Sequence, residues 1–242
     1  MGVAYGSSTI YQATKGIVQD GLVLNLDAGV KESYNGGTTW RDLKGSNDGT
    51  LTNNPTFDRD KGGSIVFDGS DDRVEIPDND LFSFVNSAFS LSVWLKTSST
   101  ISSSKGFISK GNTLTAGEYV FHSYNNQVAF RLTDNSTGAY RGVSANSAID
   151  QGVWANFVAV SDGTQEISGM SIYKNGVSLS VSDNSAGSFT GVQNTSTPLK
   201  IGARSNGEIF AGNIALSLVY NRALTATEIT QNFNVTRHRF GI

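Results

Sequence analysis

The sequence contains no cysteine and only three prolines. The missing cysteine excludes disulfide bonds, thiol catalysis and zinc sites built on cysteine. Charged residues are also scarce, at 16% of the 242 residues, where about 25% is usual for a globular domain. Serine, threonine, asparagine and 27 glycines take their place. The fold must therefore be held by packing alone, beneath a neutral, hydroxyl-rich surface with many turns.

Long hydrophobic runs and basic stripes are absent as well. No run approaches the roughly 20 apolar residues that a membrane helix needs, and the opening residues MGVAYGSSTIYQATKG lack the basic and apolar regions of an export signal. The net charge is −3, so the chain offers no attractive field to a phosphate backbone. We expect no export signal and neither a membrane nor a nucleic acid as partner.

What the sequence does contain is short stretches in which apolar and polar residues alternate. Residues 21–27, 89–95 and 213–220 alternate most clearly, which is typical of strands with one buried face. Further short strands are expected at 106–110, 119–123, 128–132, 154–160, 170–173 and 199–202. Tyr124–Gln127 and Asn175–Gly176 are expected to be hairpin turns, the second because both of its residues accept positive φ.

The stretch Ser64–Pro77 repeats this pattern on both sides of an acidic loop. The loop reads Asp68-Gly69-Ser70-Asp71-Asp72 and holds three of the 21 acidic residues. Its residues tolerate left-handed backbone or bond their own backbone, so the chain can reverse there. We expect a β-hairpin whose turn is the first candidate for a metal site.

One helix is expected, near the C-terminus. Thr225 has the position of an N-cap, with Glu228 as its capping-box partner and Leu224 against Ile229 as a hydrophobic staple. The helix should end at about Phe233 and pack on the strands. The sequence therefore predicts an all-β chain: a two-sheet antiparallel sandwich with one short C-terminal helix.

The sandwich is expected to span residues 21–235, between an N-terminal arm and a C-terminal tail. Residues 1–20 show no sustained period and are interpreted as the arm. The tail, residues 236–242, carries Arg237-His238-Arg239 but ends with Phe240 and Ile242, which favours docking over a solvated tail.

Six segments together resemble a known family. In chain order they are FDGSDDRVEIP, FSLSVWLKT, GVWANFVAVSDG, SIYKNGVSL, LKIGARS and FAGNIALSLVYNRALTATEI. They resemble the concanavalin A-like jelly roll of the laminin-G type (the LamG-like lectin/glucanase group) over roughly residues 20–235. Three further segments, GLVLNLDAG, GGTTWRDLKGSNDGTL and QNFNVTRHRFGI, resemble a version found in structural proteins of tailed bacteriophages.

The resemblance implies two stacked sheets, often a calcium ion at the rim, and binding of glycans or proteins. Calcium prefers six to eight oxygen ligands, and Asp68, Asp71 and Asp72 are the candidates to supply some of them. Asp42 and Asp48 would help from the neighbouring Asn-rich loop. A second interpretation is that aspartate and glycine are present only to make the turn, and the sequence leaves both open.

No catalytic pattern is present. Glycosidases need two carboxyl groups facing a cleft, but Pro77 interrupts the strand between Glu75 and Asp78, and the six glutamates are scattered singly. No G-x-S-x-G motif accompanies His122 or His238, and His122 is interpreted as an ordinary sheet residue. We expect a protein that is not an enzyme.

Aromatic and amide side chains in loops are the candidates for glycan contact. They are Trp40, Tyr124, Asn125, Asn126 and Tyr140. Trp40 has a second interpretation, which we favour: a large aromatic in a polar loop pins that loop to the core.

These observations predict a non-enzymatic virion component of a tailed phage, on the capsid, neck or tail, with a LamG-like adhesive domain. Its arm and tail would dock onto other virion proteins, and the protein would be oligomeric in the assembly. The alternative is a carbohydrate-binding module that attaches to glycans on a host surface. Both are binding functions, and the fold alone does not decide between them.

Overall fold

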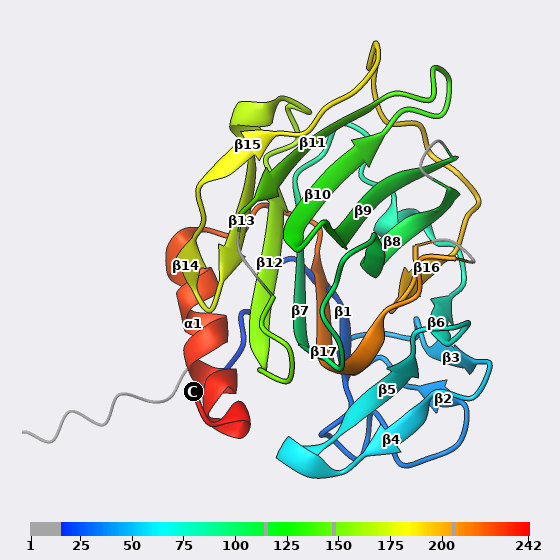
Figure 1. The fold of residues 1–242 in the computed structure, drawn as a ribbon, viewed down its shortest axis with the longest axis vertical. Coiled ribbons are helices and arrows are strands. Elements are labelled where there is room, and N and C mark those ends of the chain that lie inside the picture. Colours follow the sequence, from blue (N-terminus) through cyan, green and yellow to red (C-terminus); the bar gives the residue numbers. More distant parts are fainter. Residues whose placement is uncertain (1–15, 114–115, 147–148, 205–206) are drawn as a thin grey trace, which may run out of the picture.

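The computed structural model describes residues 16–113, 116–146, 149–204 and 207–242. Within these ranges it has two antiparallel β-sheets stacked as a sandwich and one α-helix near the C-terminus (Figure 1). This confirms the predicted fold class. Most of the expected N-terminal arm, residues 1–15, lies outside the described residues.

The first sheet has eight strands. From one edge to the other they are β14 (Val177–Ser178), β13 (Met170–Lys174), β12 (Ala155–Ser161), β7 (Phe89–Thr97), β17 (Ala211–Tyr220), β5 (Ser64–Asp68) and β4 (Thr56–Asp58). The eighth, β1 (Leu22–Asp27), also pairs with β17. Residues 211–214 of β17 pair with β5 and residues 216–220 pair with β1, so the two strands follow each other along one side of β17.

The second sheet has nine strands. In order they are β15 (Val181–Asp183), β11 (Tyr140–Ala145), β10 (Gln127–Thr133), β9 (Ala116–Tyr124), β8 (Lys105–Thr113), β16 (Leu199–Ile201), β6 (Arg73–Ile76), β3 (Gly49–Thr52) and β2 (Thr39–Trp40). The clear alternating segments all became strands. The sequence did not reveal the short strands β2, β3, β4 and β15, or β11.

The expected hairpin at Ser64–Pro77 is wrong in its pairing. β5 pairs with β4 and β17 in the first sheet, whereas β6 pairs with β3 and β16 in the second. Ile65 and Phe67 of β5 therefore face Val74 and Ile76 of β6 across the core instead of lying beside them. Alternation shows that a strand has a buried face, but it does not show which sheet the strand joins. The acidic loop spans the gap between the sheets at the rim.

The main core lies between the two sheets and is rich in aromatic rings. Phe84 and Phe89 stack with ring centroids 4.4 Å apart, and Phe107 meets Phe121 edge to face at 5.7 Å. Trp40 is fully buried in this core. It ends strand β2 and anchors the long segment between β1 and β3, so the pinning interpretation is the one the structure supports.

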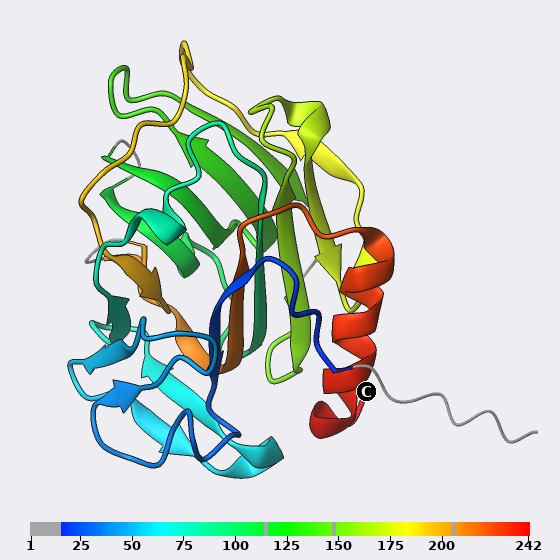
Figure 2. The ribbon, with the colours of Figure 1, turned by 180° about the vertical axis from the view of Figure 1, so that it is seen from behind.

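A second apolar layer covers the outer face of the first sheet. The helix α1 (Ala226–Thr236) lies against this sheet beside β13 and β14 (Figures 1 and 2). Trp94 of β7 points outward and stacks on Phe240 at 4.0 Å and on Phe233 at 5.8 Å. Trp154 contacts the same Phe240 ring at 4.8 Å.

The tail is therefore part of the sandwich domain. Phe240 lies in a 3-10 helix (Arg237–Phe240) that directly follows α1, and its side chain is buried. The contacts of Phe240 with Trp94 and Trp154 cross the boundary that was expected at residue 235. Of the two apolar tail residues, Phe240 packs on the sheet of its own chain, whereas Ile242 is 41% exposed.

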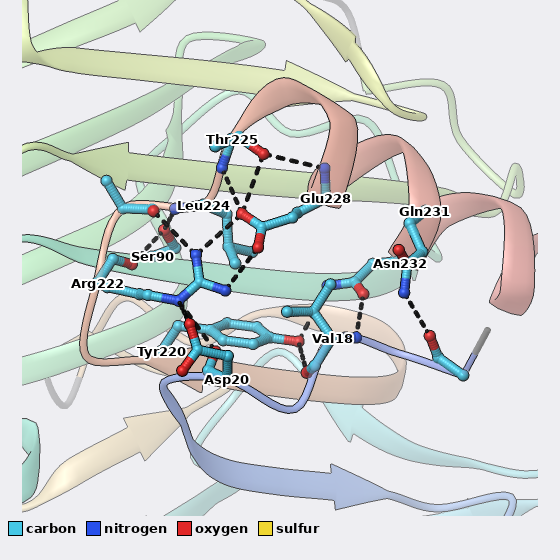
Figure 3. A network of polar contacts seen from close by, with 12 residues as sticks. Val18, Asp20, Ser90, Tyr220, Arg222, Leu224, Thr225, Glu228, Gln231 and Asn232 are labelled. Carbon is cyan, nitrogen blue, oxygen red and sulfur yellow. Dashed lines mark hydrogen bonds and ion pairs between the residues drawn. The ribbon is translucent and has the colours of Figure 1, made fainter.

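Polar contacts join the helix to the segment that precedes β1 (Figure 3). The capping box of Thr225 and Glu228 is present as predicted, and Arg222 pairs with Glu228 at 2.7 Å. The backbone N–H of Val18 donates to Asn232 Oδ1 at 2.8 Å, and its carbonyl accepts from the Tyr220 hydroxyl at 3.0 Å. Residues 16–20 are thus built into the domain. Among the described residues, no helix is both long and apolar enough to span a membrane.

Candidate functional site

The outer face of the nine-stranded sheet carries a cluster of cationic and aromatic side chains. Phe121 of β9 and Phe130 of β10 point into the core, so the next residues along each strand, His122 and Arg131, lie on the opposite face. In the part of the chain that the structure describes, no helix lies over this sheet face, in contrast to the outer face of the first sheet, which α1 covers (Figures 1 and 2).

Arg131 is the centre of this cluster. Its guanidinium carbon lies 4.2 Å from the centroid of the Tyr140 ring and 5.5 Å from that of Tyr124, and its Nη2 donates to Asn184 Oδ1 at 2.8 Å. Gly142 of β11 is directly opposite Arg131, and a Cβ there would come within 2.6 Å of Arg131 Cγ. The glycine therefore makes room for the arginine to lie along the sheet.

A second guanidinium reaches the same face from the segment after β16. Gly106 of β8 lets this segment cross the sheet closely, since a Cβ at Gly106 would lie 2.3 Å from the carbonyl carbon of Ala203. Ser109 Oγ holds the crossing in place by donating to Ala203 O at 2.8 Å. Arg204 follows directly after this crossing and forms a bidentate ion pair with Glu208.

His122 lies close to both guanidinium groups. Its Nδ1 is 2.8 Å from Ser123 O and 2.9 Å from Ser104 Oγ. A carbonyl can only accept, so Nδ1 carries the proton and Nε2 is a bare acceptor. Burial, followed by the charges of Arg204 and Arg131, holds the pKa of His122 well below its ordinary value. The imidazole is thus neutral.

Three nitrogen atoms of this cluster are buried without a hydrogen-bond partner. They are His122 Nε2, Arg131 Nε and Arg204 Nη1, and only eight such side-chain atoms occur in the described part of the chain. Buried polar atoms are nearly always paired in folded proteins, so three unpaired atoms on one face call for a physical reason. Desolvation also lowers the pKa of both guanidinium groups.

Four of the five residues predicted to contact glycans are close to this cluster. Tyr124 is 41% exposed, and Asn125 and Asn126 are exposed beside it in the turn between β9 and β10. Both asparagines have positive φ, at 47° and 59°, as a tight hairpin turn requires. Tyr140 is half-buried and begins strand β11, so it is not the loop residue that was expected.

Trp40 is the exception and was wrong as a glycan contact. Its side chain has no exposed surface, so it offers no ring face to a sugar. Arg131, Arg204 and His122 belong to the cluster on this face but were not among the predicted site residues. Arg131 was detectable, because alternation in Val128–Leu132 places it opposite the apolar side chains; Arg204 was not, since only the crossing over Gly106 brings it here.

The acidic loop at the rim forms a separate group. Asp68, Asp71 and Asp72 each offer an oxygen, and these atoms lie within 4.8 Å of one another. Asp68 Oδ1 accepts from Ser70 N at 2.8 Å and Asp72 Oδ2 from Asp68 N at 2.9 Å, which leaves the other oxygens for a ligand. Burial and then the neighbouring carboxylates raise the pKa of Asp72. The donor set suits calcium, which the remaining oxygens and water would surround.

The two aspartates expected to assist this loop have another role. Asp42 Oδ1 accepts from the backbone N–H groups of Asn25 and Lys44, both at 2.9 Å. Asp48 Oδ1 accepts from the N–H of Asp42 at 2.9 Å. Neither belongs to the acidic group. They hold the turns of their own loop, as aspartate commonly does.

Two carboxylates, of Asp78 and Glu118, share one buried cation. Asp78 and Glu118 both bind Lys110 Nζ, at 2.6 and 2.9 Å. Two threonine carbonyls, of Thr195 and Thr197, complete the shell of this buried amine. A general acid and base need access to a substrate, whereas these groups are held around a lysine.

Comparison with solved structures shows what this architecture is similar to. The binding domain of Paraclostridial Mosquitocidal Protein 1 matches with a TM-score of 0.67 and 13% identity over 88% of this chain and 52% of that one. Domain 4 of AbnA, a GH43 extracellular arabinanase from Geobacillus stearothermophilus, matches at 0.63 and 18% over 87% and 97%. The botulinum neurotoxin type G receptor binding domain matches at 0.63 and 15% over 89% and 51%.

These likenesses show a shared lectin-like jelly-roll fold. The chain spans about half the length of the two toxin domains and nearly the whole of the arabinanase domain. A comparison with the curated proteins finds no match. The family model Laminin_G_3 matches residues 68–230, about two thirds of the chain. The chain therefore belongs to the Laminin_G_3 family of the concanavalin A-like lectin/glucanases superfamily.

Proposed function

We propose that this protein is a non-catalytic carbohydrate-binding domain whose binding surface is the outer face of the nine-stranded sheet. One observation carries the proposal. The rings of Tyr124 and Tyr140 converge on the guanidinium of Arg131, beside the exposed amides of Asn125 and Asn126.

This combination suits a saccharide. A sugar ring has C–H faces that pack on aromatic rings, and hydroxyl groups that both donate and accept hydrogen bonds. Tyrosine supplies a rigid apolar ring with a polar tip, and asparagine supplies a donor and an acceptor at one position. Arg131 fixes both tyrosine rings from below, so the surface is organised before a ligand arrives, which lowers the entropic cost of binding.

The solved relatives support the same class of function. Domain 4 of the arabinanase is in complex with arabinotriose, and the neurotoxin domain binds a receptor. Lys110, by occupying Asp78 and Glu118, supports a role without catalysis.

Titration of the full chain against a glycan array tests the proposal. We expect micromolar binding to at least one saccharide and at least a tenfold loss in Tyr124→Ala. Leu81→Ala, which also removes an exposed apolar side chain, is the control and should bind like the wild type. Silence across the array, or equal binding by both variants, contradicts the proposal.

A second proposal places this domain on a tailed-phage particle, in contact with other virion proteins. It is supported by the resemblance of three segments to phage structural proteins and by the N-terminal residues, which remain a candidate arm. The test is removal of residues 1–15 alone, because a cut at residue 235 would also remove the buried Phe240. Particles that incorporate the shortened chain as well as the full chain would contradict docking through the arm.

A further inference from the structure

We infer that the saccharide bound at this face is acidic, and that its carboxylate is held by Arg131 and Arg204. The inference rests on the proposed function and specifies its ligand class. In the bound state Arg131 Nε–H and Arg204 Nη1–H donate to the ligand carboxylate, while His122 Nε2 accepts from a neighbouring sugar hydroxyl.

The first argument is charge. Arg131 is only 5% exposed, and among the described residues no carboxylate forms a salt bridge with it. Glu208 is paired with Arg204, and His122 is neutral. The cluster of two guanidinium groups and one carboxylate thus holds one excess positive charge. A buried charge without a counterion is costly, and an anionic ligand would supply the counterion.

The second argument is hydrogen bonding. The unpaired N–H groups of Arg131 and Arg204 are donors only, and an arginine has no acceptor to offer. A carboxylate is the complementary acceptor, with two oxygens and about four lone-pair positions. Hydrogen bonds between charged groups are roughly twice as strong as neutral ones. A hydroxyl group of a neutral sugar could accept a hydrogen bond from these donors, but it would leave the excess positive charge of the cluster without a counterion.

The third argument is access. The three nitrogens have almost no solvent-exposed surface of their own, but the Tyr124 ring that packs against the guanidinium of Arg131 belongs to a side chain that is 41% exposed. Tyr124 sits at the mouth of a two-residue hairpin turn, whereas Gly142 leaves no side chain of its own over Arg131. A ligand carboxylate would therefore approach Arg131 from the side of Gly142 and the exposed Tyr124 ring.

Matched pairs of acidic and neutral ligands test the inference by isothermal titration of the full chain. The probes are trigalacturonate with its methyl ester, and sialyllactose with lactose. We expect at least one acidic member to bind ten or more times tighter than its neutral partner. The advantage should fall as salt is added, because salt screens charge.

A charge-removing variant localises the effect. Arg131→Met should lose the preference for the acidic ligand by about tenfold or more, while Arg59→Met, at an exposed arginine elsewhere, should keep it. If Arg131→Met does not fold, the acid-to-neutral ratio of the wild type remains a complete test.

The outcomes separate this inference from the proposed function. Tight binding of acidic ligands that depends on Arg131 supports both. Equal binding of acidic and neutral partners, or an acidic preference retained in Arg131→Met, overturns the inference and leaves the carbohydrate-binding function standing. Binding to no saccharide on the array overturns both.

Discussion

The environment of His122 makes the stability of the fold depend on pH. It is fully buried, and burial followed by two guanidinium groups keeps its pKa well below the usual value. In the folded chain it therefore stays neutral, whereas the unfolded chain takes up a proton below about pH 6.5. The unfolded state then binds more protons, so acidification favours unfolding.

We expect the free energy of unfolding to fall, by up to about 1.4 kcal/mol per pH unit, as the pH drops below about 6.5, through this residue alone. His122→Gln removes the titrating group, so the stability difference between wild type and variant should be largest near pH 7.5 and shrink below pH 6.5. Urea unfolding at several pH values measures it. His238→Gln, at an exposed histidine, is the control. A stability difference between the wild type and His122→Gln that does not change with pH would contradict the argument.

At the same scale, the acidic loop predicts a response to calcium. Asp72 has a raised pKa from burial first, with the neighbouring carboxylates adding to it, and a cation would relieve that repulsion. Millimolar calcium should raise the melting temperature, because a ligand that binds only the folded state stabilises it. Asp71→Asn should abolish the rise, and Asp60→Asn, at an exposed aspartate elsewhere, should not. If neither calcium nor a chelator changes the melting temperature of the wild type, the aspartates only make the turn.

At the scale of elements, local patterns predicted structure well where the cause is local. The capping box at Thr225 and the Asn-Gly turn were both found, because each depends on residues within a few positions. β5 and β6 were assigned as strands correctly but paired wrongly, since sheet membership depends on distant partners such as β17 and β16. β2 and β11 escaped detection because neither shows a sustained alternation.

The capping box at the start of α1 leads to a prediction about how stability depends on pH. Hydrogen bonds from Arg222, and then from Thr225, lower the pKa of Glu228 to about 2. A lowered pKa means that this stabilisation is complete above about pH 4.5 and is lost as the pH falls toward 2. Glu228→Gln should cost about 1–2 kcal/mol at pH 7, and the cost should shrink in acid.

Thermal unfolding at pH 7 and pH 2.5 measures this loss. Asp20→Asn is the matched control, because Asp20 pairs with the same Arg222 but is 86% exposed. An exposed ion pair contributes little, so this variant should unfold like the wild type. An equal loss in both variants would show that the helix start is not the relevant feature.

At the scale of the whole molecule, the candidate site was only partly predictable. Tyr124 and the two asparagines were expected from their types, but the contact of Tyr124 with Arg131 needed the packing of three sheet strands, and a crossing segment was needed to bring Arg204 to the same face. The domain limits were also set by distant contacts. Val18, placed in the arm, is bound by Asn232 and Tyr220, and Phe240, placed in the tail, is bound by Trp94.

The tail therefore contributes to the stability of the entire domain. Phe240→Ala should cost about 3–5 kcal/mol, the usual loss for deleting a buried phenylalanine ring, because Trp94 would lose a stacked ring and Trp154 a tilted one. Ile242→Ala, two residues further and 41% exposed, should change stability by less than about 0.5 kcal/mol. Urea unfolding followed by tryptophan fluorescence reports on both. A tail that serves only to dock onto neighbouring subunits would instead leave the two variants equally stable in the isolated protein.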